Sequence, residues 1–196
     1  MDQKILSAVD HTLLTQTATW AEVKQICDDA VEYRTASVCI PPSYVKRAKE
    51  YVGDRMKVCT VIGFPNGYQT AEVKVFETED AVRNGADEID YVINVAELKN
   101  KNYKYIKEEM KRIVSVCREA GVISKVIFEN CYLTKEEIQK AAQIAKEVKP
   151  DFIKTSTGFG TGGAAVEDVK LMKAVVGGAV KVKAAGGIRD WKTCKA

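Results

Sequence analysis

Short apolar runs alternate with longer amphipathic segments along the whole chain, and this alternation limits the possible folds more than any other feature. Strands recur roughly every 20–35 residues, the spacing of a strand followed by a helix. Strict alternation of this kind predicts a parallel sheet with right-handed crossovers and helices against it. The predicted strands are 8–11, 36–40, 57–64, 88–94, 124–129, 151–155 and 180–184.

Helix starts can also be predicted from the sequence. Thr19 with Glu22, and Thr134 with Glu137, have the spacing of a capping box, in which a hydroxyl and a carboxylate each accept a hydrogen bond from the other's backbone N–H. Apolar residues follow both boxes at helical spacing. We therefore expect amphipathic helices to begin at these two positions.

The order of the polar residues favours a closed barrel over an open, doubly wound sheet. Barrel enzymes gather their catalytic groups from the C-terminal ends of many strands. We therefore expect a (β/α)8 barrel in a single domain, 1–196, with the eighth βα unit absent and the chain truncated at its C-terminus. The polar residues at predicted strand ends are Asp10, Cys39, Asn94, Glu129, Lys154 and Lys183.

Composition excludes several classes of function. The net charge of +3 comes from mixed acidic and basic residues without a long basic block, so no nucleic acid partner is expected. A single histidine, His11, and six cysteines without metal-ligand spacing predict no metal site. Without a signal peptide or a membrane-length apolar run, we expect a cytoplasmic protein that does not bind membranes.

Two lysines end consecutive predicted strands. Lys154 ends the apolar run 151–155, and Lys183 ends the next strand. A single strand-end lysine more often reaches solvent, but neighbouring strands lie only about 4.8 Å apart, so two ammonium groups there repel. Burial and this repulsion are expected to lower the pKa of one lysine toward ~7–8 and to free an amine for carbonyl substrates. Lys181 lies on the same strand face as Lys183, and we assign no function to it.

Asp90 is expected to point into the barrel, because Ile89 and Tyr91 occupy the opposite strand face. A carboxylate in that place needs a cationic or hydrogen-bonding partner, and a lysine would serve. The pair could carry protons, or it could be a structural ion pair. We expect Asp90 and Lys183 to act as a coupled pair.

Small, hydroxyl-rich or glycine-rich loops follow the two lysine strands. Thr157 and Gly158 lie in the first loop, and Gly186 and Gly187 lie in the second. Backbone N–H groups in such loops can bind phosphate, although a Gly-Gly pair alone often marks only a turn.

At these residues the chain resembles the deoxyribose-phosphate aldolase family. The similarity covers nearly the whole chain. It rests on the segments 10–14 (DHTLL), 37–42 (SVCIPP), 61–67 (VIGFPNG), 85–90 (GADEID), 125–129 (KVIFE), 152–158 (FIKTSTG) and 183–189 (KAAGGIR).

The resemblance implies a class I aldolase that reversibly cleaves 2-deoxy-D-ribose 5-phosphate to acetaldehyde and D-glyceraldehyde 3-phosphate. By this resemblance Lys154 forms the Schiff base, and Asp90 and Lys183 donate and accept protons. No cofactor is implied, and the partner is a sugar phosphate, with a homodimer as the expected assembly. The expected substrate- and phosphate-binding residues are Thr157, Gly158, Gly186, Gly187, Asp10 and Cys39.

The family has a further strand and helix, with a loop that completes the phosphate site. Two alternatives therefore stay open: an incomplete, inactive barrel that binds phosphate ligands, or another Schiff-base aldolase.

Overall fold

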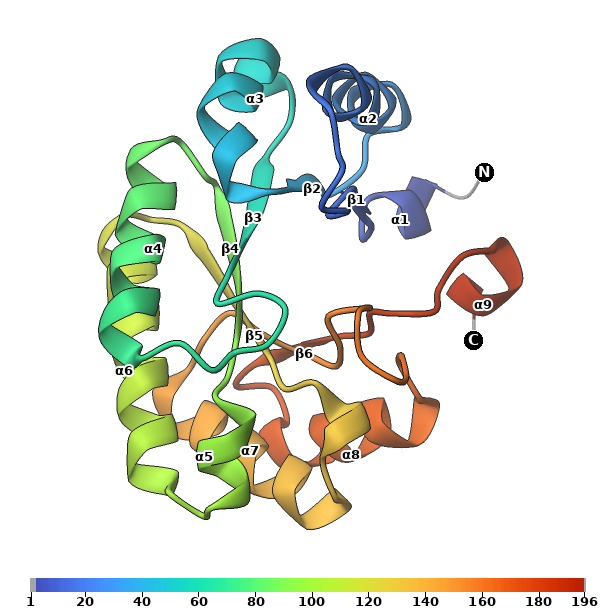
Figure 1. Cartoon of the computed structure of the whole chain (residues 1–196). Helices are drawn as coiled ribbons and strands as arrows, with labels where there is room; N and C mark the ends of the chain where they lie inside the picture. The colour runs from blue at the N-terminus through green and yellow to red at the C-terminus, as the bar shows by residue number, and fades with distance from the viewer. Residues whose placement is uncertain (1–2, 196) are drawn as a thin grey trace.

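The computed structural model describes residues 3–195, and its sheet consists of seven parallel strands in chain order (Figure 1). The strands are β1 (Asp10–Thr12), β2 (Ser37–Ile40), β3 (Val58–Ile62), β4 (Glu88–Val92), β5 (Ile123–Ile127), β6 (Phe152–Lys154) and β7 (Lys181–Lys183). All seven predicted strands are present, although most end earlier than predicted.

Helices connect the strands and cover the outside of the sheet (Figure 1). They are α1 (Gln3–Leu6), α2 (Trp20–Tyr33), α3 (Val45–Val52), α4 (Ala71–Arg83), α5 (Val95–Lys99), α6 (Tyr103–Glu119), α7 (Lys135–Val148), α8 (Val166–Val176) and α9 (Trp191–Lys195). Short 3₁₀ turns occupy Pro42–Tyr44, Gly53–Arg55 and Asn130–Tyr132.

The sheet curls so that its two outer strands approach each other. In the hydrogen-bonded order, β1 and β7 lie at opposite ends. Even so, the Nζ atom of Lys183 on β7 lies 2.7 Å from Oδ2 of Asp10 on β1. A flat, doubly wound sheet would keep these residues far apart. The prediction of a barrel-type βα fold is therefore confirmed.

The two faces of each strand have different surroundings. Ile89, Tyr91 and Ile93 face the helices and belong to the main apolar core, as predicted. Full burial of an isoleucine such as Ile89 or Ile93 contributes about 1.5–3 kcal/mol to the stability of the fold. On the inner face Cys39, Cys59 and Val61 form a second, small apolar cluster. The inner face also carries four buried charged side chains, those of Glu88, Asp90, Lys125 and Lys154.

Both capping boxes are confirmed. The hydroxyls of Thr19 and Thr134 accept from the backbone N–H groups three residues later, and the carboxylates of Glu22 and Glu137 complete the boxes. Each such cap stabilises its helix by about 1 kcal/mol. They fix where α2 and α7 begin.

A buried ion pair behind the sheet holds the ends of β3 and β4. Lys74 on α4 donates to Glu109 on α6 (2.7 Å) and to the carbonyl of Val92 (2.8 Å). Glu109 also accepts from the backbone N–H of Asn94, at 3.2 Å. Gly63 has a φ of +60°, and a Cβ there would lie 2.9 Å from Cε of Lys74. This pair therefore fixes the end of the strand that carries Asp90.

Candidate active site

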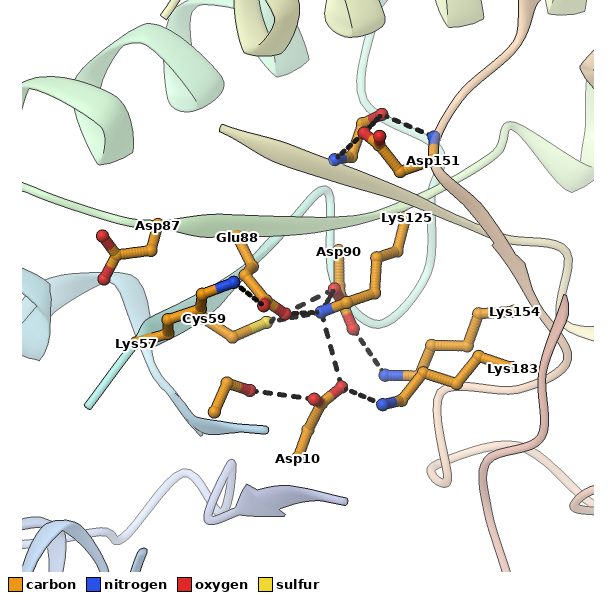
Figure 2. A network of polar contacts seen from close by, with 12 residues as sticks. Asp10, Lys57, Cys59, Asp87, Glu88, Asp90, Lys125, Asp151, Lys154 and Lys183 are labelled. Atoms are coloured by element: carbon orange, nitrogen blue, oxygen red, sulfur yellow. Dashed lines mark hydrogen bonds and ion pairs between the residues drawn. The ribbon is translucent and has the colours of Figure 1, made fainter. Parts of the chain in front are cut away.

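Strand register places the two predicted lysines side by side. Lys154 on β6 is the register partner of Lys183 on β7, and Asp90 on β4 is the partner of Lys125 on β5. Because side chains alternate along a strand, all four share the inner face of the curled sheet. Figure 2 shows their side chains converging in the interior.

Lys154 and Asp90 form a hydrogen-bonded ion pair. The Nζ atom of Lys154 lies 2.6 Å from Oδ2 of Asp90, and the Asp90 side chain is fully buried. The Lys154 side chain retains 10% exposure. The lysine is therefore reachable from the interior of the barrel while its carboxylate partner is shielded from water.

Lys125, which was not among the predicted site residues, lies at the centre of the cluster (Figure 2). Its Nζ atom is 2.7 Å from Oδ1 of Asp90, 2.6 Å from Oε2 of Glu88 and 3.4 Å from Oδ2 of Asp10. Its side chain is only 2% exposed. Three buried carboxylates thus share this one ammonium group.

Lys183 pairs with Asp10, and among the described contacts it does not touch Asp90 directly, so the coupling of Asp90 and Lys183 stays a prediction. Its Nζ atom lies 2.7 Å from Oδ2 of Asp10, whose other oxygen accepts from the hydroxyl of Ser37 at 2.9 Å. Because Lys125 contacts both Asp10 and Asp90, the two pairs are linked through it. Asp10 therefore belongs to the charged cluster and not to the glycine loops.

The pKa of Lys154 moves in the direction opposite to the expected one. Burial lowers the pKa of Lys154, but the Asp90 carboxylate outweighs it, and the net pKa lies above the ordinary value. Burial raises the pKa of Asp90, but the ammonium groups of Lys125 and Lys154 hold that pKa well below its usual range. In the protein without substrate, the pair therefore consists of an ammonium and a carboxylate.

The carboxylates around Lys125 differ in the direction of their pKa shifts. Burial raises the pKa of Glu88, and the nearby Lys125 only partly offsets this. Burial also acts upward on the pKa of Asp10, but Lys125 and Lys183 lower it overall. Of the three carboxylates around Lys125, Glu88 therefore takes up a proton most readily.

Cys39, predicted as a substrate-binding residue, is fully buried on β2 and faces the interior. Its thiol, the thiol of Cys59 and a carboxylate oxygen of Asp90 lie within 4.8 Å of one another. These groups suit a cation poorly, because two ammonium groups already compensate Asp90 and burial raises the pKa of Cys59 well above its ordinary value. We assign no metal to them.

A cavity of about 330 Å³ opens beyond the C-terminal ends of the first three strands. Its lining includes Leu14 and Val61, with Phe64 and Phe159 packed edge to face at 5.3 Å between ring centroids. Leu14, Val61 and Phe64 belong to the same inner cluster as Cys39. The cavity therefore adjoins the inner face that carries the charged cluster, and its lining mixes apolar side chains with the polar side chains of Thr15, Gln16 and Ser43.

The two predicted glycine loops lie against each other. The backbone N–H of Ala164 donates to the carbonyl of Gly186 at 3.0 Å. Gly158, Gly186 and Gly187 have φ values of +85°, +81° and +78°. Within residues 3–195, the N–H groups of these three glycines donate no hydrogen bond to the protein. Consecutive free N–H groups in such conformations can bind an anion.

We expect Lys125→Met to cost about 3–5 kcal/mol of unfolding free energy at pH 7, because it leaves three buried carboxylates without their shared cation. The loss of that cation raises the folded-state pKa of these carboxylates, so the deficit should narrow as the pH falls from 7 toward 5. Urea unfolding at both pH values measures this. Lys111→Met, which removes an exposed ion pair, should cost about 1 kcal/mol or less. A Lys125→Met deficit as small as that of the control would contradict the central role of Lys125.

The fold and the buried lysine–carboxylate pair are features of barrel enzymes that use an amine on carbonyl substrates. Residues 4–194 match the model of the DeoC/LacD family aldolases. The chain belongs to this family of aldolases.

Individual relatives agree with this assignment. The chain is 55% identical over 186 residues to the deoxyribose-phosphate aldolase of Clostridioides difficile, covering 95% of this chain and 84% of the relative. Among solved structures, the aldolase QR15 is 40% identical, with a TM-score of 0.92 and coverage of 97% and 85%. The tetrameric deoxyribose phosphate aldolase from Aeropyrum pernix is 27% identical, with a TM-score of 0.91 and coverage of 98% and 81%.

Proposed function

We propose that this chain acts as a deoxyribose-phosphate aldolase and that Lys154 is its nucleophile. The family and the relatives support the activity. The observation that carries the choice of residue is the 2.6 Å hydrogen bond between Nζ of Lys154 and Oδ2 of Asp90 inside the barrel. An amine that must lose a proton lies directly against a group that can accept it.

The reaction begins with transfer of a proton from Lys154 toward Asp90. The neutral amine adds to the C1 aldehyde of open-chain 2-deoxyribose 5-phosphate, and loss of water gives the protonated imine. The C2–C3 bond then breaks, with its electron pair moving toward the imine nitrogen, while the C3 hydroxyl gives up its proton. D-Glyceraldehyde 3-phosphate leaves, C2 takes up a proton, and water releases acetaldehyde from Lys154.

The cluster around Lys154 can carry these protons. Asp90 contacts Lys154 directly, and Lys125 connects Asp90 to Asp10 and Lys183. With His11 exposed on the outer side of β1 near Asp29, no imidazole takes part. We assign the proton transfers at the reacting atoms to Asp90 and Lys183, in agreement with the sequence-based expectation.

The phosphate of the substrate is assigned to the glycine loops. The free N–H groups of Gly158, Gly186 and Gly187 offer donors at the ends of β6 and β7, beside the two lysines. Thr157 and Cys39 complete the proposed substrate-binding set together with Asp10. No cofactor enters this scheme, since every step uses an amine, a carboxylate or water.

The remaining sequence-based expectations concern assembly and location. The Aeropyrum pernix relative is tetrameric, whereas a homodimer and a cytoplasmic location for this chain stay predictions. Within the described residues no helix combines the length and apolarity needed to cross a membrane.

Reductive trapping tests the proposed function. Incubation with acetaldehyde and borohydride should inactivate the enzyme and leave an ethylated lysine, which peptide mass mapping should place at Lys154. Borohydride without a carbonyl compound should leave Lys154 unmodified, because no imine is present to be reduced. An adduct found only on Lys181 or Lys183 would show that the nucleophile is that lysine and not Lys154. Complete absence of an adduct and of cleavage would favour the inactive phosphate-binding alternative.

A further inference from the structure

We propose that Glu129 is a positioning residue that acts through Thr157 to hold the loop between β6 and α8 in the shape that binds the substrate's phosphate. This inference rests on the proposed function, which assigns the phosphate to that loop. Neither residue touches the Lys154 pair in the described contacts, so the effect should fall on phosphate recognition and not on imine chemistry.

Glu129 has an unusual backbone conformation for a residue with a side chain. It lies two residues beyond the end of β5, with φ 57° and ψ 61°, in the left-handed region. That region is uncommon for residues other than glycine, and such residues cluster at functional sites. Glu129 is also only 3% exposed. Its conformation turns a buried carboxylate toward the neighbouring loop after β6.

The carboxylate of Glu129 accepts from both hydrogen-bond donors of Thr157. The backbone N–H of Thr157 donates to Oε1 at 3.1 Å, and the Thr157 hydroxyl donates to Oε2. The same hydroxyl oxygen accepts from the backbone N–H of Phe159 at 3.0 Å. Hydrogen bonds to a charged acceptor are among the strongest that proteins form. Glu129 thus engages both hydrogen-bond donors of Thr157, so Thr157 contributes to the phosphate site through the shape of the loop.

The loop passes so close to Glu129 that a side chain would not fit. A Cβ at Gly160 would lie 2.7 Å from Sγ of Cys131 and 3.2 Å from the carboxyl carbon of Glu129. On the other side, a Cβ at Gly163 would lie 2.3 Å from the carbonyl oxygen of Gly186. The loop is thus fixed between the end of β5 and the loop after β7.

This fixation determines where the free N–H groups point. The hydrogen bonds of Thr157 and Phe159 flank Gly158, whose own N–H donates to no group among the described residues. Gly158 lies against the second glycine loop, since a Cβ on it would be 3.9 Å from Cα of Gly186. Loosening Thr157 should therefore misplace Gly158 while leaving Lys154 and Asp90 in contact.

The test compares a substrate that carries the phosphate with one that lacks it. Glu129→Gln keeps the size of the side chain but replaces one acceptor oxygen with a donor and removes the charge. We expect it to raise KM for 2-deoxyribose 5-phosphate about 10-fold, the loss of roughly one such hydrogen bond. For unphosphorylated 2-deoxyribose, kcat/KM should stay within about 3-fold of the starting enzyme. The affinity for inorganic phosphate, measured by calorimetry, should fall in parallel.

Three further variants make the test specific. Glu129→Gly removes the side chain but tolerates the positive φ, so it should reproduce the effect if Glu129→Gln fails to fold. Thr157→Ser keeps the hydroxyl and the backbone N–H that contact Glu129, so it should lose less phosphate affinity than Thr157→Val. Thr157→Val should weaken phosphate binding, and combining it with Glu129→Gln should add little, because both act on one contact. Glu109→Gln, which alters a buried carboxylate elsewhere, is the control. Any change that it causes in kcat/KM should be the same for the two sugars.

The outcomes separate this inference from the proposed function. Equal losses of kcat/KM for both sugars, or an unchanged affinity for phosphate, would overturn the positioning role of Glu129. Neither result would contradict the proposed aldolase function. If the unaltered chain cleaves neither sugar, the proposed function fails, and the phosphate affinity of the variants still decides whether Glu129 shapes an anion site.

Discussion

Lys154→Arg is expected to abolish cleavage of 2-deoxyribose 5-phosphate, with turnover falling roughly 10⁴–10⁶-fold, as when a covalent nucleophile is removed. Arginine keeps a positive charge beside Asp90, so the buried carboxylate stays compensated. Its guanidinium does not lose a proton at accessible pH and cannot form an imine. Stability should therefore change far less than activity, and borohydride with acetaldehyde should leave no adduct in the barrel.

The measurement combines steady-state kinetics, thermal unfolding and mass mapping of the trapped protein. Lys111→Arg provides the control, because Lys111 is exposed on α6, where it pairs with Glu108. Lys183→Arg is a second control. It should still form the adduct at Lys154, because Lys154 is the lysine proposed to form the imine. Persistence of an imine in the Lys154→Arg variant would show that another lysine is the nucleophile.

The fold could be predicted because its determinants are local and repeated. Alternation of strands with amphipathic helices gave all seven strands, and the capping boxes at Thr19 and Thr134 placed two helix starts. The strand ends were less predictable. Phe64 and Ile93 continue an apolar pattern, yet the chain leaves the sheet before them because the buried Lys74–Glu109 pair and the glycine at position 63 redirect it.

The contacts between the residues of the site were harder to predict from the sequence than the residues themselves. Alternation placed Asp90 on the inner face, and the consecutive lysine strands placed Lys154 beside Lys183. The linear pattern does not single out Lys125, because this lysine lies in the middle of an apolar strand, where the pattern predicts only burial. Its strand parity, which puts it on the same inner face as Asp90 in the next strand, was the available signal.

The direction of the Lys154 pKa shift illustrates why strand neighbours alone are not enough. The sequence places two lysines on adjacent strands, and repulsion between them would lower a pKa. Curling of the sheet brings Asp90 to 2.6 Å from Lys154 and Asp10 to 2.7 Å from Lys183. Each ammonium therefore has its own carboxylate, and these short contacts outweigh the repulsion. Contacts across a barrel depend on closure, which a linear pattern does not specify.

Asp90→Asn should separate formation of the imine from turnover. Asparagine keeps the shape of the side chain but removes its charge and its ability to accept a proton, so turnover should fall about 10²–10⁴-fold. Lys154 would lose the carboxylate that raises its pKa, while burial would continue to lower that pKa. Trapping with acetaldehyde and borohydride should therefore persist and extend to lower pH than in the unaltered enzyme.

Stability measurements decide between a proton carrier and a structural ion pair. The folded-state pKa of Asp90 lies below its unfolded value, so the carboxylate contributes stability above about pH 4 that is lost as the pH falls through the folded-state pKa. Unfolding of Asp90→Asn and of the starting enzyme should differ most near pH 7 and converge in acid. Glu109→Gln, which disturbs the buried pair with Lys74, should destabilise the chain while leaving most of its turnover. If Asp90→Asn behaved like this control, with near-normal turnover and an early melt, Asp90 would serve only as the counter-charge for Lys125 and Lys154, and proton transfer at Lys154 would have to pass through Lys183 and Asp10.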